Sequence, residues 1–362
     1  MHPTDVPQTE LAATGAAHTE LEVISNARDF CALANEWERL RTEASSASVF
    51  NTWMWQFAWW EQHGRPRTLK IVVARRAGRA IGIAPLYVHR RRGLRVLRLL
   101  GTEADGNPYN IAPLFARSGE AAAARALAQA ILALPGYDVL EFADTDAAVP
   151  LAMALAHAAQ AAALRHEMRR ARRLVHLPLP ASWNAYLRSL GSEQRARLRH
   201  RRQALLAAHP ARFFVWHTGV DAMLNALAML RRSGATQDPS LQQAAMSEAL
   251  KEGRLRLYCL QIDGALAALA CAMRLRERLV LMQTEFDARY APWHPVSVLL
   301  HYAIEHAIEE GTKGFDFLRG PDDREEEFGA GTEQIGVTVF RSAIAAAAFR
   351  ARKALSGAPA TP

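Results

Sequence analysis

Apolar and polar residues alternate along the chain with two periods, one typical of helices and one typical of strands. In residues 50–64, FNTWMWQFAWWEQHG, Trp53, Phe57 and Trp60 recur at helical spacing and form one apolar stripe. Trp55 and Trp59 form a second stripe on the same helix. A helix that is apolar on two sides is usually buried, so we predict that the first stripe packs in the core. The second stripe is either more core or an aromatic binding surface.

The same patterns predict the remaining elements. Helices are expected at 28–43, 52–62, 119–134, 150–164, 182–190, 193–208, 220–232, 240–251 and 296–310. Strands are expected at 68–76, 79–89, 94–101, 137–142, 173–178, 212–217, 254–262, 265–275, 278–286, 313–318 and 334–341. Residues 1–20 and 346–362 are expected to be flexible tails.

Three pairs of segments repeat in the same order along the chain. LKIVVARRAGRAIGIA (69–84) matches LRLYCLQIDGALAALA (255–270), TEAD (102–105) matches TEFD (284–287), and YDVLEFADTD (137–146) matches FDFLRGPDD (315–323). The order predicts two tandem α/β units with mixed antiparallel and parallel sheets flanked by helices. We expect the units at 21–180 and 211–345, joined by basic helices at 181–210. Ligands of such sheets tend to bind beyond the carboxyl ends of the strands.

Composition and charge narrow the class of protein. The chain has 362 residues, 44 Lys and Arg against 36 Asp and Glu, and a net charge of +8. Its arginines are clustered, which favours an anionic partner without deciding which. The three cysteines have no metal-ligand spacing, and no metal is expected. No apolar run is long enough to span a membrane and the N-terminus lacks the apolar core of a signal peptide, so we expect a cytoplasmic protein.

The order of elements resembles the GNAT acyltransferase fold, and its duplication resembles the tandem GNAT arrangement of Fem-like transferases. Within that group the chain is most similar to CelD-like acetyltransferases of cellulose and exopolysaccharide biosynthesis. The likeness extends over roughly residues 20–345. It is carried by FNTWMWQFAWWEQHG, LKIVVARRAGRAIGIAPLYV, LLGTEADGNPYN, WNAYLRSLGSEQRARLRHRRQAL and PVSVLLHYAIEHAIEEGTKGFDFLRG. The resemblance implies an enzyme that transfers an acyl group, acetyl in the simplest case, from acyl-CoA to an amine or hydroxyl acceptor.

The resemblance also directs attention to particular residues. The start of helix 296–310 would bind the donor's pyrophosphate through its free N–H groups, and the residues assigned to the donor are His294, Val296, Ser297 and Arg319. The catalytic candidates are the strand-end carboxylates Glu285 and Asp316, with Asp287 beside them, and Tyr290 to protonate a leaving thiolate. Asp138 holds the place of Asp316 in the first repeat, so Asp316 is also interpretable as a residue of the fold.

Acceptor-binding candidates lie in three places. They are Trp55 and Trp59, of which one or the other would face the groove between units; the polar loop residues Glu103, Asp105, Asn107 and Tyr109; and the basic helix residues Arg195 and Arg199. The expected partners are a glycan acceptor and proteins of polysaccharide biosynthesis. Two alternatives stay open: a Fem-like transferase that uses aminoacyl-tRNA, and a catalytically degenerate GNAT pair that acts as a scaffold. Val296, where the family commonly has glycine, favours the scaffold.

Overall fold

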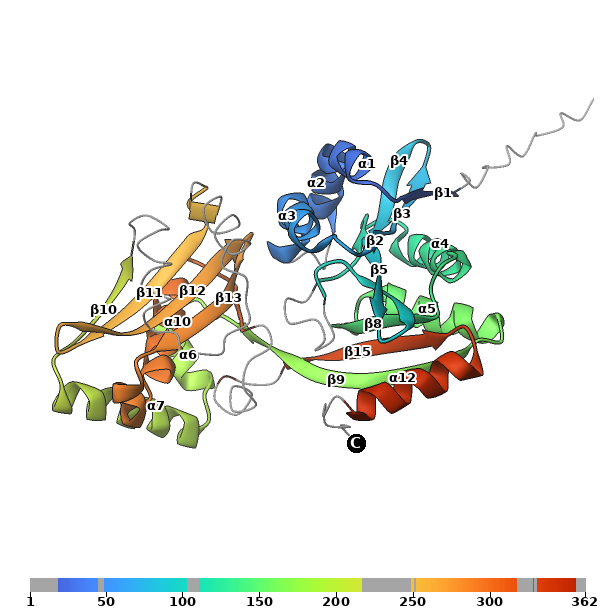
Figure 1. The fold of residues 1–362 in the computed structure, drawn as a ribbon. Coiled ribbons are helices and arrows are strands. Elements are labelled where there is room, and N and C mark those ends of the chain that lie inside the picture. Colours follow the sequence, from blue (N-terminus) through green and yellow to red (C-terminus); the bar gives the residue numbers. More distant parts are fainter. Residues whose placement is uncertain are drawn as a thin grey trace, which may run out of the picture.

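The computed structural model describes residues 19–44, 49–102, 111–216, 249–250, 252–317, 328 and 331–355 (Figure 1). Sheets of mixed direction are flanked by helices, so the predicted fold class is confirmed. The helices are α1 (Ala27–Ala32), α2 (Ala34–Glu43), η1 (Val49–Asn51), α3 (Trp53–His63), α4 (Glu120–Ala133), α5 (Pro150–Ala161), α6 (Trp183–Ser189), α7 (Ser192–Ala208), η2 (Ala288–Trp293), α10 (Pro295–Glu309) and α12 (Ala343–Leu355).

The strands form one large sheet and one small one. They are β1 (Thr19–Ile24), β2 (Thr68–Leu69), β3 (Ile71–Arg76), β4 (Arg79–Ala84), β5 (Leu86–Arg91), β6 (Leu94–Leu99), β7 (Leu114–Phe115), β8 (Val139–Asp146), β9 (Arg165–Pro178), β10 (Ala211–Trp216), β11 (Leu255–Ile262), β12 (Ala265–Leu275), β13 (Arg278–Phe286), β14 (Gly314–Asp316) and β15 (Gly331–Phe340). The large sheet has the order β10-β11-β12-β13-β14-β9-β15-β8-β6-β5-β2, and the small sheet β1-β3-β4-β7.

The long strand β9 belongs to both halves of the large sheet. Its last residues, His176–Pro178, pair with β14, and the rest of the strand pairs with β15. We call β1–β9 with α1–α5, β15 and α12 the first unit, and β10–β14 with α6, α7 and α10 the second unit. Figure 1 shows β9 running from one unit into the other.

The two units share their turn geometry and their strand directions. The β3–β4 hairpin turns at Ala77 and Gly78 and the β11–β12 hairpin at Asp263 and Gly264, all four with positive φ, which suits a tight hairpin turn. In each unit a long helix then leads to a strand that joins the sheet in parallel, β6 with β8 and β13 with β14. The predicted duplication therefore matches the structure.

Separate apolar clusters stabilise each face of the large sheet. In the first unit, α5 covers one face of the large sheet through residues such as Leu155, and α4 packs on α5 and on β3 and β4 of the small sheet through residues such as Leu127. The helix α12 covers the other face through Ala345 and Ala346. In the second unit, α10 packs on β11–β13 through residues such as Leu299. A further cluster joins α1–α3 of the first unit to the opposite face of β11–β13, so the units share part of their core.

The helix α3 buries a different stripe from the one that the sequence predicted. Trp55 and Trp59 are only 6% and 4% exposed, whereas Trp53, Phe57 and Trp60 are half-buried at the margin of the same cluster. The reason is the position of the neighbouring elements. The ring of Trp59 lies 5.2 Å from that of Tyr87 on β5, and Trp55 packs edge-on against Phe50 of η1. The surplus tryptophans are therefore core residues.

Three segments near the chain ends depart from the expected organisation. β15, expected to close the second unit, lies between β8 and β9 in the first. Residues 346–355, expected to be a flexible tail, belong to α12, whose alanine-rich sequence strongly favours a helix. β1 starts at Thr19, inside the expected N-terminal tail, because it pairs with β3 along its whole length. The predicted helix at 220–232 lies outside the described residues. Of the predicted helix at 240–251 only Ala249 and Leu250 are described, and both are helical.

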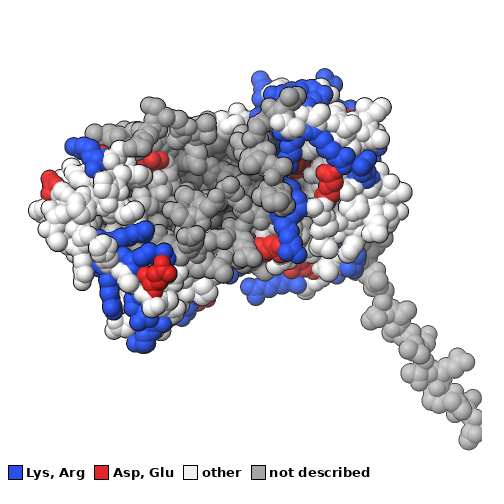
Figure 2. All heavy atoms as spheres, turned by 90° about the horizontal axis from the view of Figure 1, so that it is seen from below, with Lys and Arg blue, Asp and Glu red and all other residues white. Residues whose placement is uncertain are grey.

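Three basic elements run along one side of the molecule. In Figure 1, α7, β9 and α12 follow one another along the lower edge, from left to right. Figure 2 shows the molecule from that side, with blue patches of Lys and Arg on both halves.

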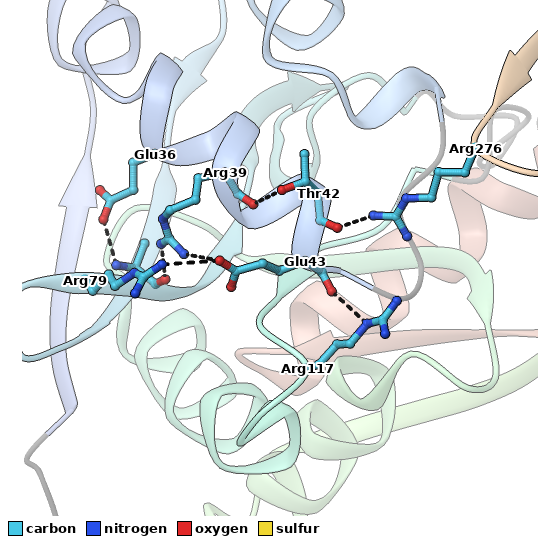
Figure 3. A network of polar contacts seen from close by, with 8 residues as sticks. Glu36, Arg39, Thr42, Glu43, Arg79, Arg117 and Arg276 are labelled. Carbon is cyan, nitrogen blue, oxygen red and sulfur yellow. Dashed lines mark hydrogen bonds and ion pairs between the residues drawn. The ribbon is translucent and has the colours of Figure 1, made fainter.

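One arginine links the units directly. Arg276, in the β12–β13 turn, donates to the backbone oxygens of Ala44 (3.2 Å), Arg41 (3.2 Å) and Thr42 at the end of α2 (Figure 3). A helix C-terminus carries partial negative charge, so a guanidinium there is favourable. Burial, and secondarily the nearby positive charge led by Arg117, lowers the pKa of Arg276.

Candidate functional site

The candidate site lies at the carboxyl end of β13, where this strand extends beyond the end of its neighbour β14. These parallel strands pair only over Arg278–Val280 and Gly314–Asp316, and β13 then continues to Phe286 without β14. A register shift in the pairing with β12, at Cys271/Ala272, changes which face the later side chains of β13 occupy. The carboxyl end of β13 leads through the short helix η2 into α10. The carboxyl end of β13 and the N-terminus of α10 therefore lie at the same end of the sheet.

The first turn of α10 has the properties of an anion site. Pro295 occupies its first position, and no side chain caps its N–H groups and no acidic residue lies in this turn. Free N–H groups and the helix dipole favour negative charge at such an end. The preceding residue, His294, has φ 48° and ψ 52°, in the left-handed region. The residue with positive φ is therefore His294. The resemblance to the family placed a glycine two residues later, at the position of Val296.

A guanidinium from another helix faces this turn. Arg201 of α7 donates to the Oγ of Ser297 at 2.8 Å. Leu198 and Leu205 are the buried residues of α7, and Arg201 lies on the same side because it is three residues from one and four from the other. The backbone oxygen of Ser297 is 2.8 Å from Nδ1 of His301. Ser297 thus connects the start of α10 to a cation that could neutralise a bound phosphate.

The predicted catalytic residues are dispersed. Glu285 accepts from Nε2 of Gln283 at 2.8 Å, and it pairs with Leu269, whose side chain lies on the sheet face opposite α10. Asp316 pairs with Val280 of β13, five residues before Glu285, or about 17 Å at strand spacing. The two carboxylates are therefore not alternatives for one proton. Tyr290 donates its hydroxyl to the Ile262 carbonyl at 3.3 Å.

Two of the acidic candidates have structural partners. Asp287 accepts from the backbone N–H and guanidinium of Arg289, and these hydrogen bonds lower the pKa of Asp287. Asp316 lies 3.3 Å from Nδ1 of His176 and 3.9 Å from Nη1 of Arg278. Because Asp138 and Arg95 form the equivalent pair in the first unit, the interpretation of Asp316 as a residue of the fold is strengthened.

The predicted acceptor residues do not gather in one place. Trp55 and Trp59 are in the core, and the helix residue Arg195 donates to the Leu190 carbonyl at 3.0 Å. Arg199 is exposed on α7. Glu103, Asp105, Asn107 and Tyr109 of the polar loop, and Arg319 of the donor set, lie outside the described residues. The roles assigned to all of these residues stay predictions.

Sequence reasoning missed two features near this site. Arg201 was passed over for the stripe that contains Arg195 and Arg199, although its spacing from Leu198 and Leu205 marks it as facing the protein. His209 lies 2.8 Å through Nδ1 from Asp263, and its ring packs edge-on against Trp293 just before α10. No sequence signal joins these last residues, because the contact depends on the tertiary fold.

The chain offers no sign of a metal centre in the residues that can be described. No group of three or more His, Cys, Asp or Glu side chains is placed there to hold an ion. Cys259 and Cys271 are buried, and this burial raises the pKa of Cys259 to about 12 and raises that of Cys271 further. Neither thiol is a nucleophile at neutral pH. Within the same described residues, no helix has both the length and the apolar character needed to cross a membrane.

One known family matches the part of the chain that contains the candidate site. A family model described as acetyltransferase (GNAT) domain matches residues 192–326, which include α7, β10–β14 and α10. By this match, residues 192–326 are similar to a GNAT-type acetyltransferase domain. GNAT domains generally use acetyl-CoA as the acyl donor. Comparison with the sequences of curated proteins gives no match.

Solved structures show that the likeness of fold extends over both units. FemX has a TM-score of 0.57 at 11% identity, covering 89% of this chain and 97% of its own. The C-terminal domain of a putative lysylphosphatidylglycerol synthetase from Agrobacterium fabrum has a TM-score of 0.55 at 12% identity, covering 93% and 99%. L-PGS from Bacillus licheniformis has a TM-score of 0.53 at 12% identity, covering 88% and 96%. At these identities the likeness is one of fold.

Proposed function

We propose that this protein is an acyltransferase that moves an acetyl or longer acyl group from coenzyme A to an amine or hydroxyl of a glycan acceptor in the cytoplasm. The observation that carries the proposal is the uncapped first turn of α10, inside the GNAT-like region, with Arg201 bonded to Ser297. The helix N–H groups and the guanidinium would together hold the donor's pyrophosphate. His294 precedes this turn and Val296 lies within it, and both would shape the approach of the donor.

Glu285 is the carboxylate best placed to act as the general base. Asp287 is tied to Arg289, and Asp316 lies near Arg278 and His176. Glu285 is half-buried near the end of β13, on the face opposite α10. A donor held at α10 would therefore extend past the end of β14 to bring its thioester near Glu285.

The proposed reaction conserves protons overall. The acceptor nitrogen or oxygen attacks the thioester carbonyl carbon while Glu285 takes the proton that this atom loses. The carbon–sulfur bond then breaks, and the departing thiolate takes a proton. Tyr290 would supply that proton on release from the Ile262 carbonyl, to which its hydroxyl donates. Proton exchange with solvent then returns Glu285 to the carboxylate and Tyr290 to the phenol before the next turnover.

The place in polysaccharide or surface-glycan biosynthesis rests on the likeness to CelD-like proteins. It makes a glycan and proteins of the same biosynthetic process the expected partners. The acceptor would contact the loop of Glu103, Asp105, Asn107 and Tyr109.

A second candidate is a Fem-like transferase with an aminoacyl-tRNA donor. It is favoured by the likeness of fold to FemX over nearly the full length of both chains. The exposed arginine Arg199 and the half-buried Arg195 on α7 would then contact tRNA phosphates, and binding would weaken steeply with salt.

Calorimetric titration with acetyl-CoA and longer acyl-CoAs separates these candidates. We expect binding by the unmodified protein and its loss in Ser297→Glu, because the new carboxylate would repel the pyrophosphate at the start of α10. Ser192→Glu makes the same change in the first turn of α7 and should leave binding intact. Absence of acyl-CoA binding by folded protein, with salt-sensitive binding of aminoacyl-tRNA, would replace the first candidate by the second. Binding of neither would support a degenerate scaffold.

A further inference from the structure

The positive charge of the chain is concentrated in three elements. The sequence of α7 contains five Arg and one Glu, that of β9 five Arg and one Glu, and that of α12 three Lys or Arg and no acidic residue. Together they have a net charge of +11 against +8 for the whole chain, so the remainder is net negative. The three elements also lie along one side of the molecule (Figures 1 and 2). We call their exposed residues the basic face.

Ion pairs neutralise only part of this face. Glu167 pairs with Arg350, Glu333 with Arg170 at 3.2 Å, and Glu193 with Arg197 at 3.4 Å. One exposed cation on each element has no acidic partner among the residues that the structure describes: Arg165 on β9, Arg199 on α7 and Lys353 on α12. These three cations are available to an external anion.

Exposed apolar side chains occur on two of these elements. Ile344 of α12 is 82% exposed and Leu206 of α7 48%. Cations next to exposed aliphatic side chains are typical of proteins that lie on an anionic bilayer, where the cations meet lipid headgroups and the apolar groups enter the interface. A surface for single-stranded nucleic acid would instead present aromatic rings for stacking. None of the large apolar residues exposed in the described part is aromatic.

We propose that the basic face docks the protein on a membrane that contains anionic lipids. Charge complementarity supplies the attraction, and Ile344 and Leu206 add apolar contact at the interface. The contact is peripheral, and it is independent of the proposed transfer reaction. A protein held in this way would work on acceptors that are themselves at the membrane.

Vesicle co-sedimentation tests the proposal. We expect binding to vesicles of equal parts phosphatidylcholine and phosphatidylglycerol, loss of binding as salt is raised, and no binding to phosphatidylcholine alone. The triple variant Arg165→Glu/Arg199→Glu/Lys353→Glu should bind on the order of a hundredfold more weakly, because each cation contributes about fivefold. Ile344→Ser should weaken binding roughly fivefold, because its side chain no longer enters the apolar layer.

A matched variant separates the face from net charge. Arg28→Glu/Arg125→Glu/Arg212→Glu changes the charge equally at exposed positions on α1, α4 and β10, and it should bind like the unmodified protein. Equal loss in both triple variants, or equal binding to both kinds of vesicle, would overturn the proposal. Binding of duplex nucleic acid that the first triple variant loses, without vesicle binding, would assign the face to nucleic acid instead. If the triple variant melts early, the single variant Arg199→Glu, with its expected fivefold loss, decides.

Discussion

The first and second units start their long helices in the same way but prepare different chemistry there. α4 follows Gly119, with φ 84°, and α10 follows His294, with φ 48°. In both units the backbone therefore enters the long helix from a residue in the left-handed region. The first turn of α4 contains Glu120, whose pKa is raised by burial. The first turn of α10 contains no acidic residue and faces Arg201. The same helix start can therefore bind an anion in the second unit, whereas in the first unit it carries a carboxylate of its own.

The sheets of the units differ as well. In the second unit β12 runs without interruption from Ala265 to Leu275. In the first unit the corresponding strand is divided at Pro85 into β4 and β5, which belong to different sheets. Proline cannot donate to a neighbouring strand, which explains the break at that residue. The second unit thus has a continuous sheet under α10, whereas the corresponding strands of the first unit are divided between two sheets.

Arg201→Ala should have the largest effect, because it removes the cation that distinguishes the start of α10 in the second unit from the start of α4 in the first. Loss of a charged hydrogen-bond donor at α10 should weaken acyl-CoA binding by at least about tenfold, and Arg201→Lys should restore part of it. Titration calorimetry measures both. The neighbouring variant Arg202→Ala breaks the 3.1 Å pair with Glu305 and the contact of the guanidinium with the Phe213 ring, and it should leave the affinity unchanged. Equal affinities for Arg201→Ala and the unmodified protein would exclude α10 as the donor site.

Arg276→Ala should uncouple the units. Its guanidinium bonds three carbonyls at the end of α2 and is partly removed from water there, while the rest of the residue stays exposed. We therefore expect a loss of about 1 kcal/mol in the free energy of unfolding. Amide hydrogen exchange should rise at the end of α2 and in the β12–β13 turn together. Arg117→Ala removes a bond to the same helix from within the first unit, at 3.2 Å to the Glu43 carbonyl, and should leave the β12–β13 turn protected.

His294→Gly and Gly119→Ala should act in opposite directions. A non-glycine residue in the left-handed region costs about 1 kcal/mol, so His294→Gly should stabilise the protein by up to that amount. Gly119→Ala should destabilise it similarly, because a Cβ at Gly119 meets nothing closer than 3.6 Å and only φ is unfavourable. Chemical denaturation measures both changes. Equal effects of the same sign would show that the two helix starts are not equivalent.

Asp138→Asn should have the smallest effect, and one that depends on pH. The hydrogen bond from Arg95 lowers the pKa of Asp138 in the folded protein. The stability that this carboxylate contributes is therefore present above its unfolded pKa, near 4, and is lost as the pH falls through the lower folded value. Denaturation at pH 7 should show a small deficit in Asp138→Asn that shrinks below about pH 4. A deficit that grows with acid would contradict the assigned pairing.

Sequence periodicity was sufficient wherever the structure depends on neighbours along the chain. The β3–β4 and β11–β12 hairpins, α4 and α10 all lie where they were predicted, because turn residues and helical spacing are local signals. The pairing of β15 with β8 and β9 had no such signal, since its partners are far away in the sequence. Arg201 and the His209–Asp263 pair were missed for the same reason: tertiary packing brings them to α10.

The place of β15 has a consequence for the order in which the chain folds on the ribosome. β8 and β9 are not neighbours in the sheet, because β15 fills the position between them. Protein synthesis delivers β8 and β9 early and β15 almost last, after all of the second unit. The half that is made first is therefore finished last: its sheet stays open until residue 340 has emerged. Protein that is released before that point carries two unpaired strand edges, which are templates for association with other chains.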